Sequence, residues 1–396
     1  MALPTPSSRI SLLRPTAVNT VLAEVREARA AGRDIASLLR GEPDLPTPEH
    51  IVAAAERALR EGRTGYPDNQ GEPALREAVA AKLARENHLH YSAGDEILIT
   101  TGATLGIYAA LAAALEPGDE VLLPEPIYDA YRSPIALAGG TARSIPAQRV
   151  NDRFVLDADA VRDACGPRSR VLLLNHPWNP TGTVFRRAEL AALVAVAEQQ
   201  NLLVLSDEIY EAIRYDDREF VSPAALSNAA RARTIVINSF SKTYAMTGWR
   251  LGYCAGPALW MRAIFLVLQQ ASRGPATFVQ DAGVAALNGS QECVEQMRCE
   301  YSRRRESVCT ALAGLPYARV LPPEGGFFAM VDLRAAEEPS DRARRRLLWD
   351  HGVVVMHGAA YGAAGEGTLR ISFAAGGRSL EQGLARLREG LCAKSE

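Results

Sequence analysis

Lysine is rare in this chain, which makes each remaining lysine a candidate for chemistry. Of the 44 basic residues only three are lysine, and the others are arginine. A guanidinium stays protonated in proteins, whereas a lysine amine can lose its proton and attack a carbonyl carbon. Lys82 lies on the polar side of a helical pattern, and Lys394 is in the C-terminal tail. We therefore expect Lys242, in the sequence NSFSKTYAMTGWRLGY, to be the reactive lysine.

Three more polar side chains follow short segments rich in Val, Ile and Leu. Asn179 stands in HPWNPTG after residues 171–174, and Asp207 and Tyr210 stand in SDEIY after residues 202–205. Such apolar segments are typical of strands buried on both faces. Ligands of open parallel sheets bind beyond the carboxyl ends of the strands, so these side chains are expected to share one site.

A phosphate site is predicted where another apolar segment, residues 97–100, meets a helical pattern. Gly102, Ala103 and Thr104 begin that helix, and free N–H groups at a helix start attract phosphate. The same Thr-Gly sequence is also typical of a plain turn, so the prediction depends on the residues that accompany it. Ser239 and Arg250, which flank the candidate lysine, would add a hydroxyl and a cation.

These residue types together are what pyridoxal 5′-phosphate requires. A lysine amine would hold its aldehyde, an aspartate would keep its ring nitrogen protonated, and the helix start would hold its phosphate. The sequence contains no GxxxxGK[ST] or HExxH motif and no GxGxxG after a strand, and the six histidines lack metal-ligand spacing. We therefore expect pyridoxal phosphate as cofactor, and no metal.

The alternation of strands and helices predicts an α/β fold with two domains. Residues 46–285 are expected to form a three-layer, cofactor-binding large domain around a mostly parallel sheet. Residues 1–45, an N-terminal arm and part of the small domain, are expected to pack with residues 286–396 as a smaller α+β domain. Strands of the large sheet are expected at residues 97–100, 121–123, 171–174, 202–205 and 234–237.

Composition narrows the class of protein. The 396 residues are 47% hydrophobic and 23% charged, with a net charge of −2, which excludes a disordered chain and disfavours a nucleic-acid binder. No segment has the length or apolarity of a membrane span or the pattern of a signal peptide. The six cysteines form no CxxC pair, which indicates reduced thiols and a cytoplasmic protein.

The ordered motifs give a resemblance over nearly the whole chain. It resembles the fold type I pyridoxal-phosphate aminotransferases of class I/II, in their aspartate aminotransferase branch. The matching blocks are GEPDLPTPEHI (41–51), GYPDNQGEPALREAV (65–79), NPTG (179–182), SDEIYE (206–211), SFSKTYAMTGWRLGY (239–253) and LRISFA (369–374).

The resemblance assigns roles to residues of this chain. It implies that Lys242 binds the cofactor covalently, that Asp207 pairs with its ring nitrogen, and that Asn179 and Tyr210 bond its phenolic oxygen. The remaining cofactor contacts that it implies are the phosphate ligands Gly102, Ala103, Ser239 and Arg250, with Thr104 beside them, and Tyr128 stacked on the ring.

It also implies how substrate is bound and how the site is completed. Arg370 would bind the α-carboxylate of the substrate, and the backbone at Gly41 would line the substrate site. Tyr66 would reach a cofactor phosphate across the interface of a homodimer with shared active sites. The expected partners are an amino acid and a keto acid.

Two positions bear on the choice of substrate. Relatives in this branch that prefer dicarboxylic substrates carry a lysine just after the phosphate-loop glycine, where this chain has Ala103. Trp178, directly before Asn179, either lines the side-chain pocket or packs in the core. The sequence therefore favours neutral or aromatic amino acids, and aspartate stays an alternative.

Transamination by this scaffold has two competitors. A β-eliminating lyase uses the same cofactor, because small changes of the pocket redirect its chemistry. A non-catalytic transcription regulator with an aminotransferase-like domain is disfavoured, since residues 1–40 are too few for a winged-helix module.

Overall fold

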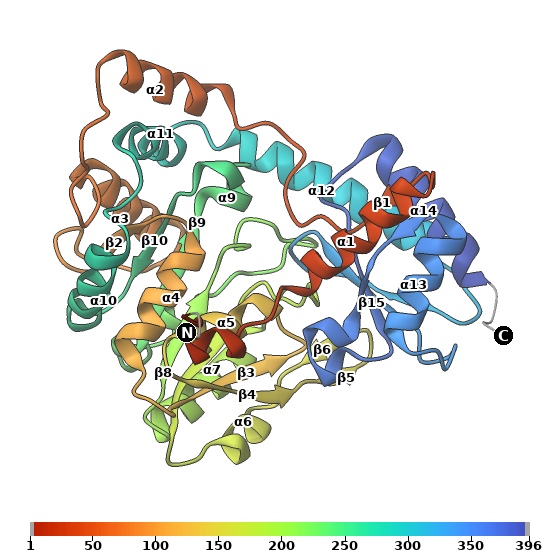
Figure 1. Cartoon of the computed structure of the whole chain (residues 1–396). Helices are drawn as coiled ribbons and strands as arrows, with labels where there is room; N and C mark the ends of the chain where they lie inside the picture. The colour runs from red at the N-terminus through yellow and green to blue at the C-terminus, as the bar shows by residue number, and fades with distance from the viewer. Residues whose placement is uncertain (1–3, 393–396) are drawn as a thin grey trace.

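A seven-stranded sheet organises the larger part of the molecule (Figure 1). The computed structural model describes residues 4–392, and within them this sheet has the strand order β2-β10-β9-β8-β7-β3-β4. Strand β10 runs antiparallel to both of its neighbours, and the other neighbouring pairs are parallel. The strands are β2 (Ile97–Thr100), β3 (Glu120–Glu125), β4 (Thr141–Pro146), β7 (Ser169–Asn175), β8 (Leu203–Asp207), β9 (Thr234–Ser239) and β10 (Gly252–Ala255).

Helices cover both faces of this sheet, which confirms the predicted three-layer α/β fold. Successive strand residues point to opposite faces. Accordingly Ile97 and Ile99 pack in one apolar cluster with α3 and α11, while Leu98 packs in another with α4 and α10. The helices of this part are α2 (Glu49–Arg60), α3 (Pro73–Asn87), α4 (Ala103–Ala114), α5 (Arg132–Leu137), α6 (Ala158–Ala164), α7 (Arg187–Gln199), α8 (Asn228–Ala232), α9 (Phe240–Thr243), α10 (Ala258–Ala271) and α11 (Thr277–Asn288).

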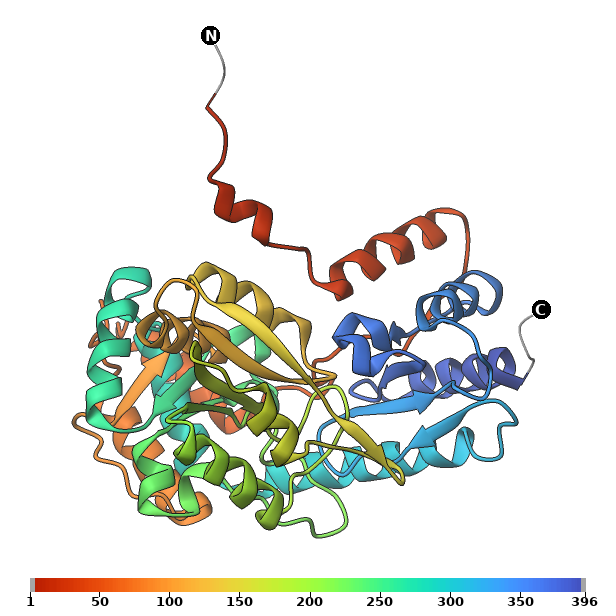
Figure 2. The ribbon, with the colours of Figure 1, turned by 90° about the horizontal axis from the view of Figure 1, so that it is seen from below.

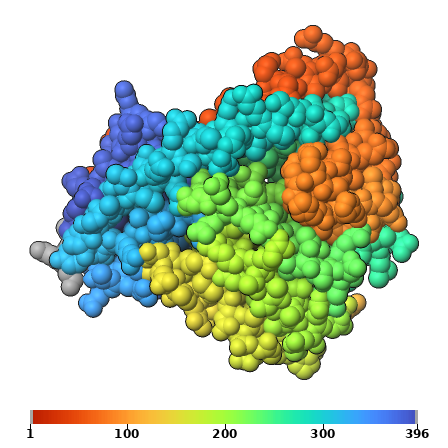
Figure 3. Space-filling view, turned by 180° about the vertical axis from the view of Figure 1, so that it is seen from behind, coloured from red at the N-terminus to blue at the C-terminus, as the bar shows by residue number. Residues whose placement is uncertain are grey.

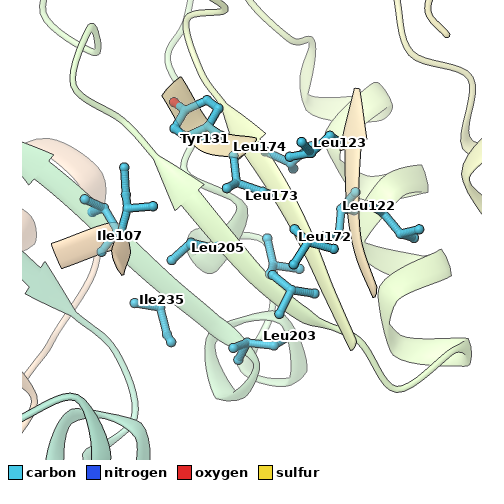
Figure 4. Packing of buried hydrophobic residues seen from close by; sticks show 14 of the residues in the cluster. Ile107, Leu122, Leu123, Tyr131, Leu172, Leu173, Leu174, Leu203, Leu205 and Ile235 are labelled. Atoms are coloured by element: carbon cyan, nitrogen blue, oxygen red, sulfur yellow. The ribbon is translucent and has the colours of Figure 1, made fainter. Parts of the chain in front are cut away.

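The apolar residues of the central strands are buried (Figure 4). Leu172, Leu173 and Leu174 have no exposed area, which explains why their sequence is continuously apolar rather than alternating. Strand β8 extends beyond its apolar sequence and ends at Asp207, so this carboxylate is the last residue of the strand. Ser239 likewise ends β9.

The sequence did not predict β10 and β4. Strand β10 has the sequence GYCA, which contains no β-branched residue, although all four residues are buried. Strand β4 lies at the sheet edge, and only Ile145 of its six residues is buried. Neither segment has the continuous apolar run that marks an interior strand.

A second core unites the two ends of the chain. Val21 and Val25 of the N-terminal helix pack against Leu348 and Val354, so the N-terminal segment lies on the C-terminal part of the chain. Its antiparallel sheet has the order β11-β12-β15-β14, and β1 pairs with β13. The elements are α1 (Ala17–Ala30), α12 (Glu292–Ala311), α13 (Ser340–His351), α14 (Gly377–Cys392), β1 (Ala36–Ser37), β11 (Arg319–Leu321), β12 (Phe328–Asp332), β13 (Val353–Val354), β14 (Met356–His357) and β15 (Thr368–Ser372).

Short elements connect these parts. A two-stranded hairpin contains β5 (Gln148–Val150) and β6 (Arg153–Val155). The 3-10 helices are η1 (Ser8–Leu12), η2 (Asp129–Tyr131), η3 (Pro223–Ala225), η4 (Thr247–Trp249), η5 (Gly358–Tyr361) and η6 (Ala363–Gly365). Figure 2 shows η1 projecting from the body of the molecule, with α1 beside the C-terminal segment. No helix within residues 4–392 is long and apolar enough to cross a membrane.

Candidate active site

A single cavity of about 770 Å³ lies where the carboxyl ends of the central strands meet the small domain. It brings together most of the residues that the sequence singled out, although they come from distant parts of the chain. The predicted site residues that line it are Gly41, Ala103, Thr104, Tyr128, Asn179, Asp207, Tyr210, Ser239, Lys242, Arg250 and Arg370.

Lys242 projects into this cavity from the short helix α9. Ser239 caps that helix, because its Oγ accepts a hydrogen bond of 3.2 Å from the backbone N–H of Ser241. Lys242 Nζ donates a hydrogen bond of 2.7 Å to the carbonyl oxygen of Gly41. Burial lowers the pKa of the lysine to about 8, against the opposing effect of the nearby Glu42 carboxylate. About a tenth of the amine is therefore neutral at pH 7 and able to act as a nucleophile or base.

Asp207 ends β8 with its carboxylate almost fully buried. Burial raises its pKa to about 6, while hydrogen bonds from Tyr131 and from the Ile209 N–H favour the charged form. Tyr131 Oη donates to Asp207 Oδ2 over 2.5 Å. A buried carboxylate of this kind gains most from a cationic partner, and a protonated pyridine nitrogen is such a partner.

The Asn-Pro loop after β7 is held by a hydrogen bond to Asn175, which ends β7 and is itself bonded to the neighbouring strand β8. Asn175 Oδ1 accepts a bond of 2.7 Å from the backbone N–H of Asn179, and Asn175 Nδ2 donates to the carbonyl oxygen of Asp207 over 3.1 Å. Tyr210 packs edge-on against Phe328, with a centroid separation of 6.2 Å. These contacts place an amide and a phenol at the same end of the cavity as Asp207.

A cradle for an anion lies at the start of α4. Gly102 adopts φ +79°, and a Cβ there would lie 2.5 Å from Arg250 Nη2. Only glycine therefore lets the guanidinium approach the helix start, whose first N–H groups have no partner within the helix. The cradle also contains Ala103 and Ser239. This combination of N–H groups, a hydroxyl and an arginine fits a phosphate.

Arg370 projects from β15 into the cavity and is only 3% exposed. Its Nη2 donates to the Leu39 carbonyl oxygen over 3.1 Å, and its Nη1 donates to Asn179 Oδ1 over 3.4 Å. Its Nε is buried and has no hydrogen-bond partner among the described residues. A buried donor without a partner is costly, and a substrate carboxylate would satisfy it. Together with the anion cradle and the buried Asp207, this donor set fits pyridoxal phosphate and an amino acid.

Three predicted site residues do not line the cavity. Trp178 is 2% exposed and stacks on Phe185, with a centroid separation of 5.4 Å. It belongs to the core of the large sheet and does not line the cavity, so its position favours the packing role over the substrate contact. Tyr66 is 89% exposed in this chain, within 5.9 Å of the Arg273 guanidinium. Gly102 does not line the cavity itself but borders it, directly before Ala103.

The expectation for Lys82 was also wrong, because its side chain is buried rather than on a solvated face. Its Nζ donates to Asn87 Oδ1 over 2.8 Å and pairs with Glu211. The loop that carries Glu211 covers this side of α3, and helical periodicity alone contains no information on that loop. Lys82 nevertheless lies outside the active-site cavity, so Lys242 is the lysine that lines it.

Sequence reasoning missed Tyr131 and Asn175 as supports of the site. Tyr131 contacts Asp207 across the sheet edge, and Asn175 fixes the Asn179 loop. Asn175 had a usable signal, since it follows an apolar strand directly. Tyr131 had none, because nothing local to the sequence PIYDAY shows which of its tyrosines turns inward.

The chain is similar to known proteins over almost its whole length. Residues 33–386 match the family described as aminotransferase class I and II. The probable aspartate/prephenate aminotransferase of Aquifex aeolicus is 36% identical over 390 residues, which cover 97% of this chain and 98% of that relative. The solved aspartate aminotransferase from Rhizobium meliloti has a TM-score of 0.94 at 34% identity, covering 98% of this chain and 99% of that one. The aromatic aminotransferase from Pyrococcus horikoshii has a TM-score of 0.87 at 35% identity. The match covers 92% of this chain and 98% of that one.

Proposed function

Since this chain belongs to the class I and II aminotransferases, we propose that it moves the amino group of a neutral or aromatic L-amino acid to a 2-keto acid. The chain is a pyridoxal-phosphate-dependent aminotransferase by its family. The observation that carries the assignment of its site is the meeting of Lys242, Asp207 and Arg370 in one cavity.

The bound pyridoxal phosphate supplies an electron sink for the negative charge that develops on the substrate when its α-proton leaves. Lys242 Nζ is the base that takes this proton, and the lowered pKa of its amine suits that role. Asp207 holds a proton on the ring nitrogen by offering a buried negative charge. Asn179 and Tyr210 donate hydrogen bonds that fix the orientation of the ring.

Arg370 binds the α-carboxylate through its planar guanidinium, with the unpaired Nε as one donor. Its contacts with the Leu39 carbonyl oxygen and with Asn179 hold the guanidinium in place before substrate arrives. The ring of Phe328, 4.1 Å from the guanidinium carbon, covers one face of it. The substrate is thereby oriented with its Cα toward Lys242.

The substrate preference rests on the apolar part of the cavity. Val18, Leu22 and Ile107 contribute to its wall, and Ala103 offers no charge for a distal carboxylate. Arg40 also lines the cavity but pairs with Glu42. A panel of amino donors assayed with pyruvate, oxaloacetate and 2-oxoglutarate tests the preference. Neutral or aromatic donors are expected to give the highest kcat/KM, and aspartate as the best donor would contradict the proposal.

The lyase alternative finds no support in the comparisons, since the relatives described above are all named aminotransferases. A simple assay separates the two reactions. Transfer produces a keto acid from the donor only when a second keto acid is supplied. Release of pyruvate and ammonia from a β-substituted amino acid without an acceptor would instead support elimination.

A homodimer with shared active sites is part of the proposal. Tyr66 is almost fully exposed in the single chain, and the projecting 3-10 helix η1 exposes Ile10 and Leu12 at 55% and 60% (Figure 2). A second subunit of a two-fold dimer would cover such residues and bring the Tyr66 phenol to a cofactor phosphate. An obligate interface of this kind is expected to bury more than about 2,000 Å².

Subunit exchange tests this arrangement. Chains with Lys242→Ala and chains with Tyr66→Ala are each expected to be inactive or strongly impaired. Mixed under exchange conditions, they should regain part of the activity, because one hybrid site contains both Lys242 and Tyr66. A fully active monomer in sedimentation at assay concentration would contradict the shared site.

We also propose a cytoplasmic location. The cysteines of the chain are all free thiols, as expected of a protein from a reducing compartment. Fractionation of source cells tests this, with the expected result that the protein accumulates in the cytoplasmic fraction. Recovery in an oxidising compartment would contradict it.

A further inference from the structure

A second cavity, of about 460 Å³, adjoins the active site on a different side of α9. Phe240 and Thr243 of that helix line the second cavity, whereas Ser241 and Lys242 line the first. Further parts of its wall come from the end of α3, the loop after β8, the strands β9 and β10, the end of α11 and the start of α12. Figure 3 shows the molecule from behind, where α12 (cyan) runs beside the green middle of the chain toward its orange part.

One cation of this cavity lacks a partner. The Arg214 side chain is half-buried and lies over the ring of Phe220 at 5.7 Å, but it makes no hydrogen bond or ion pair with any residue between 4 and 392. The other two cations of the wall are paired, Lys82 with Glu211 and Arg298 with Glu295. Burial lowers the pKa of Arg214, against the opposing effect of the Glu211 carboxylate, which is itself paired with Lys82. An anion in the cavity would offset the cost of burying the Arg214 charge.

A buried hydroxyl of the same cavity is also without a partner. Tyr253 on β10 is 3% exposed, and its Oη makes no hydrogen bond within the described residues. A buried polar group without a hydrogen-bond partner costs free energy. A hydrogen bond from the hydroxyl to a ligand oxygen would offset that cost. This is a second, independent indication of a polar ligand.

The remaining wall combines apolar side chains with polar ones, among which Glu211 and Glu295 are paired with Lys82 and Arg298. Phe220, Phe240, Tyr244, Leu287 and Val294 surround the space between the polar groups. The volume lies within the range of ordinary small-molecule sites. The cavity is thus suited to a compact molecule that has an anionic end and an apolar body.

Hydrogen bonds connect this cavity to the active site. Glu211 accepts from Asn87 over 2.7 Å and from Asn238 over 2.7 Å. Asn238 Oδ1 in turn accepts from the backbone N–H of Ser239 over 2.7 Å, and Ser239 caps the helix that carries Lys242. A ligand that displaces any member of this network would therefore act on the position of α9.

We propose that the second cavity binds a small carboxylate with an apolar or aromatic body, and that its occupancy acts on Lys242 through α9. The carboxylate pairs with Arg214, and a polar atom of the ligand accepts a hydrogen bond from Tyr253 Oη. Hydrophobic amino acids and the corresponding 2-keto acids both have this chemistry.

Equilibrium dialysis of the holoenzyme with labelled 3-phenylpropionate tests the proposal. Arg370→Gln is included in every sample to weaken binding in the active site. Arg214→Gln in this background is expected to weaken the remaining binding at least about tenfold, and Tyr253→Phe to weaken it less. Arg303→Gln is the matched control, because Arg303 is an exposed arginine of α12 that does not line the cavity.

Equal affinity in the Arg214→Gln and Arg303→Gln proteins would overturn the proposal. If the Arg370→Gln protein still binds two molecules per chain, the proposed role of Arg370 is wrong. If Arg214→Gln then removes one of these two molecules, the second site is still supported. Displacement of the probe by L-phenylalanine but not phenylpyruvate identifies an amino acid as the ligand, and the reverse identifies a keto acid.

The link to Lys242 has its own readout. Saturation with 3-phenylpropionate in the Arg370→Gln background should change the visible absorbance of the bound cofactor, and Arg214→Gln should abolish that change. Binding without any spectral change would overturn the link to α9.

Discussion

Lys242 Nζ donates a hydrogen bond of 2.7 Å to the carbonyl oxygen of Gly41, a residue 201 positions earlier in the chain. This bond joins the large sheet to the segment that leads out of the small domain. It occupies one donor of the amine, while burial holds the pKa of the amine near 8. The lysine is thus held at the junction of the two cores before any ligand is bound.

The lowered pKa of Lys242 predicts how the cofactor-free protein combines with pyridoxal phosphate. Only the neutral amine attacks an aldehyde. The rate of combination should rise about tenfold per pH unit below pH 8 and level off above it. Stopped-flow absorbance measures the rate. Reduction with borohydride, followed by peptide mass analysis, should find the label on Lys242 and not on the buried Lys82, and label on Lys82 would refute the assignment.

Asp207→Ala should reduce kcat at least about 100-fold, on the scale of a preorganised electrostatic group. The substitution removes the buried negative charge that holds a proton on the ring nitrogen. Steady-state kinetics at saturating cofactor measures the loss. Asp207→Glu, which retains the charge, is the comparison, and it should recover part of the rate. A near-normal kcat for Asp207→Ala would exclude the role.

Tyr131→Phe tests a positioning residue that sequence motifs did not reveal. The phenol hydrogen bond favours the charged form of Asp207, so its removal should raise the pKa of Asp207 above its present value of about 6. The acid limb of the kcat profile should move to higher pH, because the carboxylate must be ionised. Tyr128→Phe is the control, since within the described residues the Tyr128 hydroxyl makes no hydrogen bond to Asp207. An unchanged profile for Tyr131→Phe would limit this tyrosine to packing.

Arg370→Lys should raise KM for every amino acid and keto acid alike, because a lysine reproduces the planar fork of the guanidinium poorly. We expect a loss of about tenfold or more in kcat/KM. Kinetics with acidic, neutral and aromatic substrates measures the pattern. A loss confined to acidic substrates would assign Arg370 to the side-chain pocket instead.

Glu208 should make stability depend on pH. The side chain has no exposed area, and burial raises its pKa from 4.5 to about 8. The folded protein then holds a proton that the unfolded chain releases, so the contribution of Glu208 is full below pH 4.5 and is lost as pH rises through 8. The decline is at most about 1.4 kcal/mol per pH unit. Urea unfolding of the wild type and of Glu208→Gln measures it.

The two proteins should differ in pH dependence, with the free energy of unfolding of the wild type falling relative to that of Glu208→Gln between pH 4.5 and 8. Parallel curves over this range would show that Glu208 is already ionised in the folded protein. Glu219→Gln, at an exposed surface pair with Arg187, is the control and should leave the dependence unchanged.

The sequence alone was sufficient to predict five of the seven strands of the large sheet and the residue types near their carboxyl ends. Apolar segments followed within a few residues by Asn179, Asp207 and Lys242 predicted both the strands and the shared site. The reason is physical, since interior parallel strands must be apolar on both faces and their carboxyl ends must converge. The order of residues along the chain is therefore enough to predict this part of the structure.

The tertiary structure decided which side chains turn inward and what covers them. Trp178 packs in the core rather than in the pocket, Lys82 is buried beneath the loop of Glu211, and Tyr131 rather than another tyrosine contacts Asp207. Periodicity places residues on one face of an element, but it contains no information on which distant segment packs over that face. Such contacts depend on the packing of the whole chain, and so they could be found only in the folded molecule.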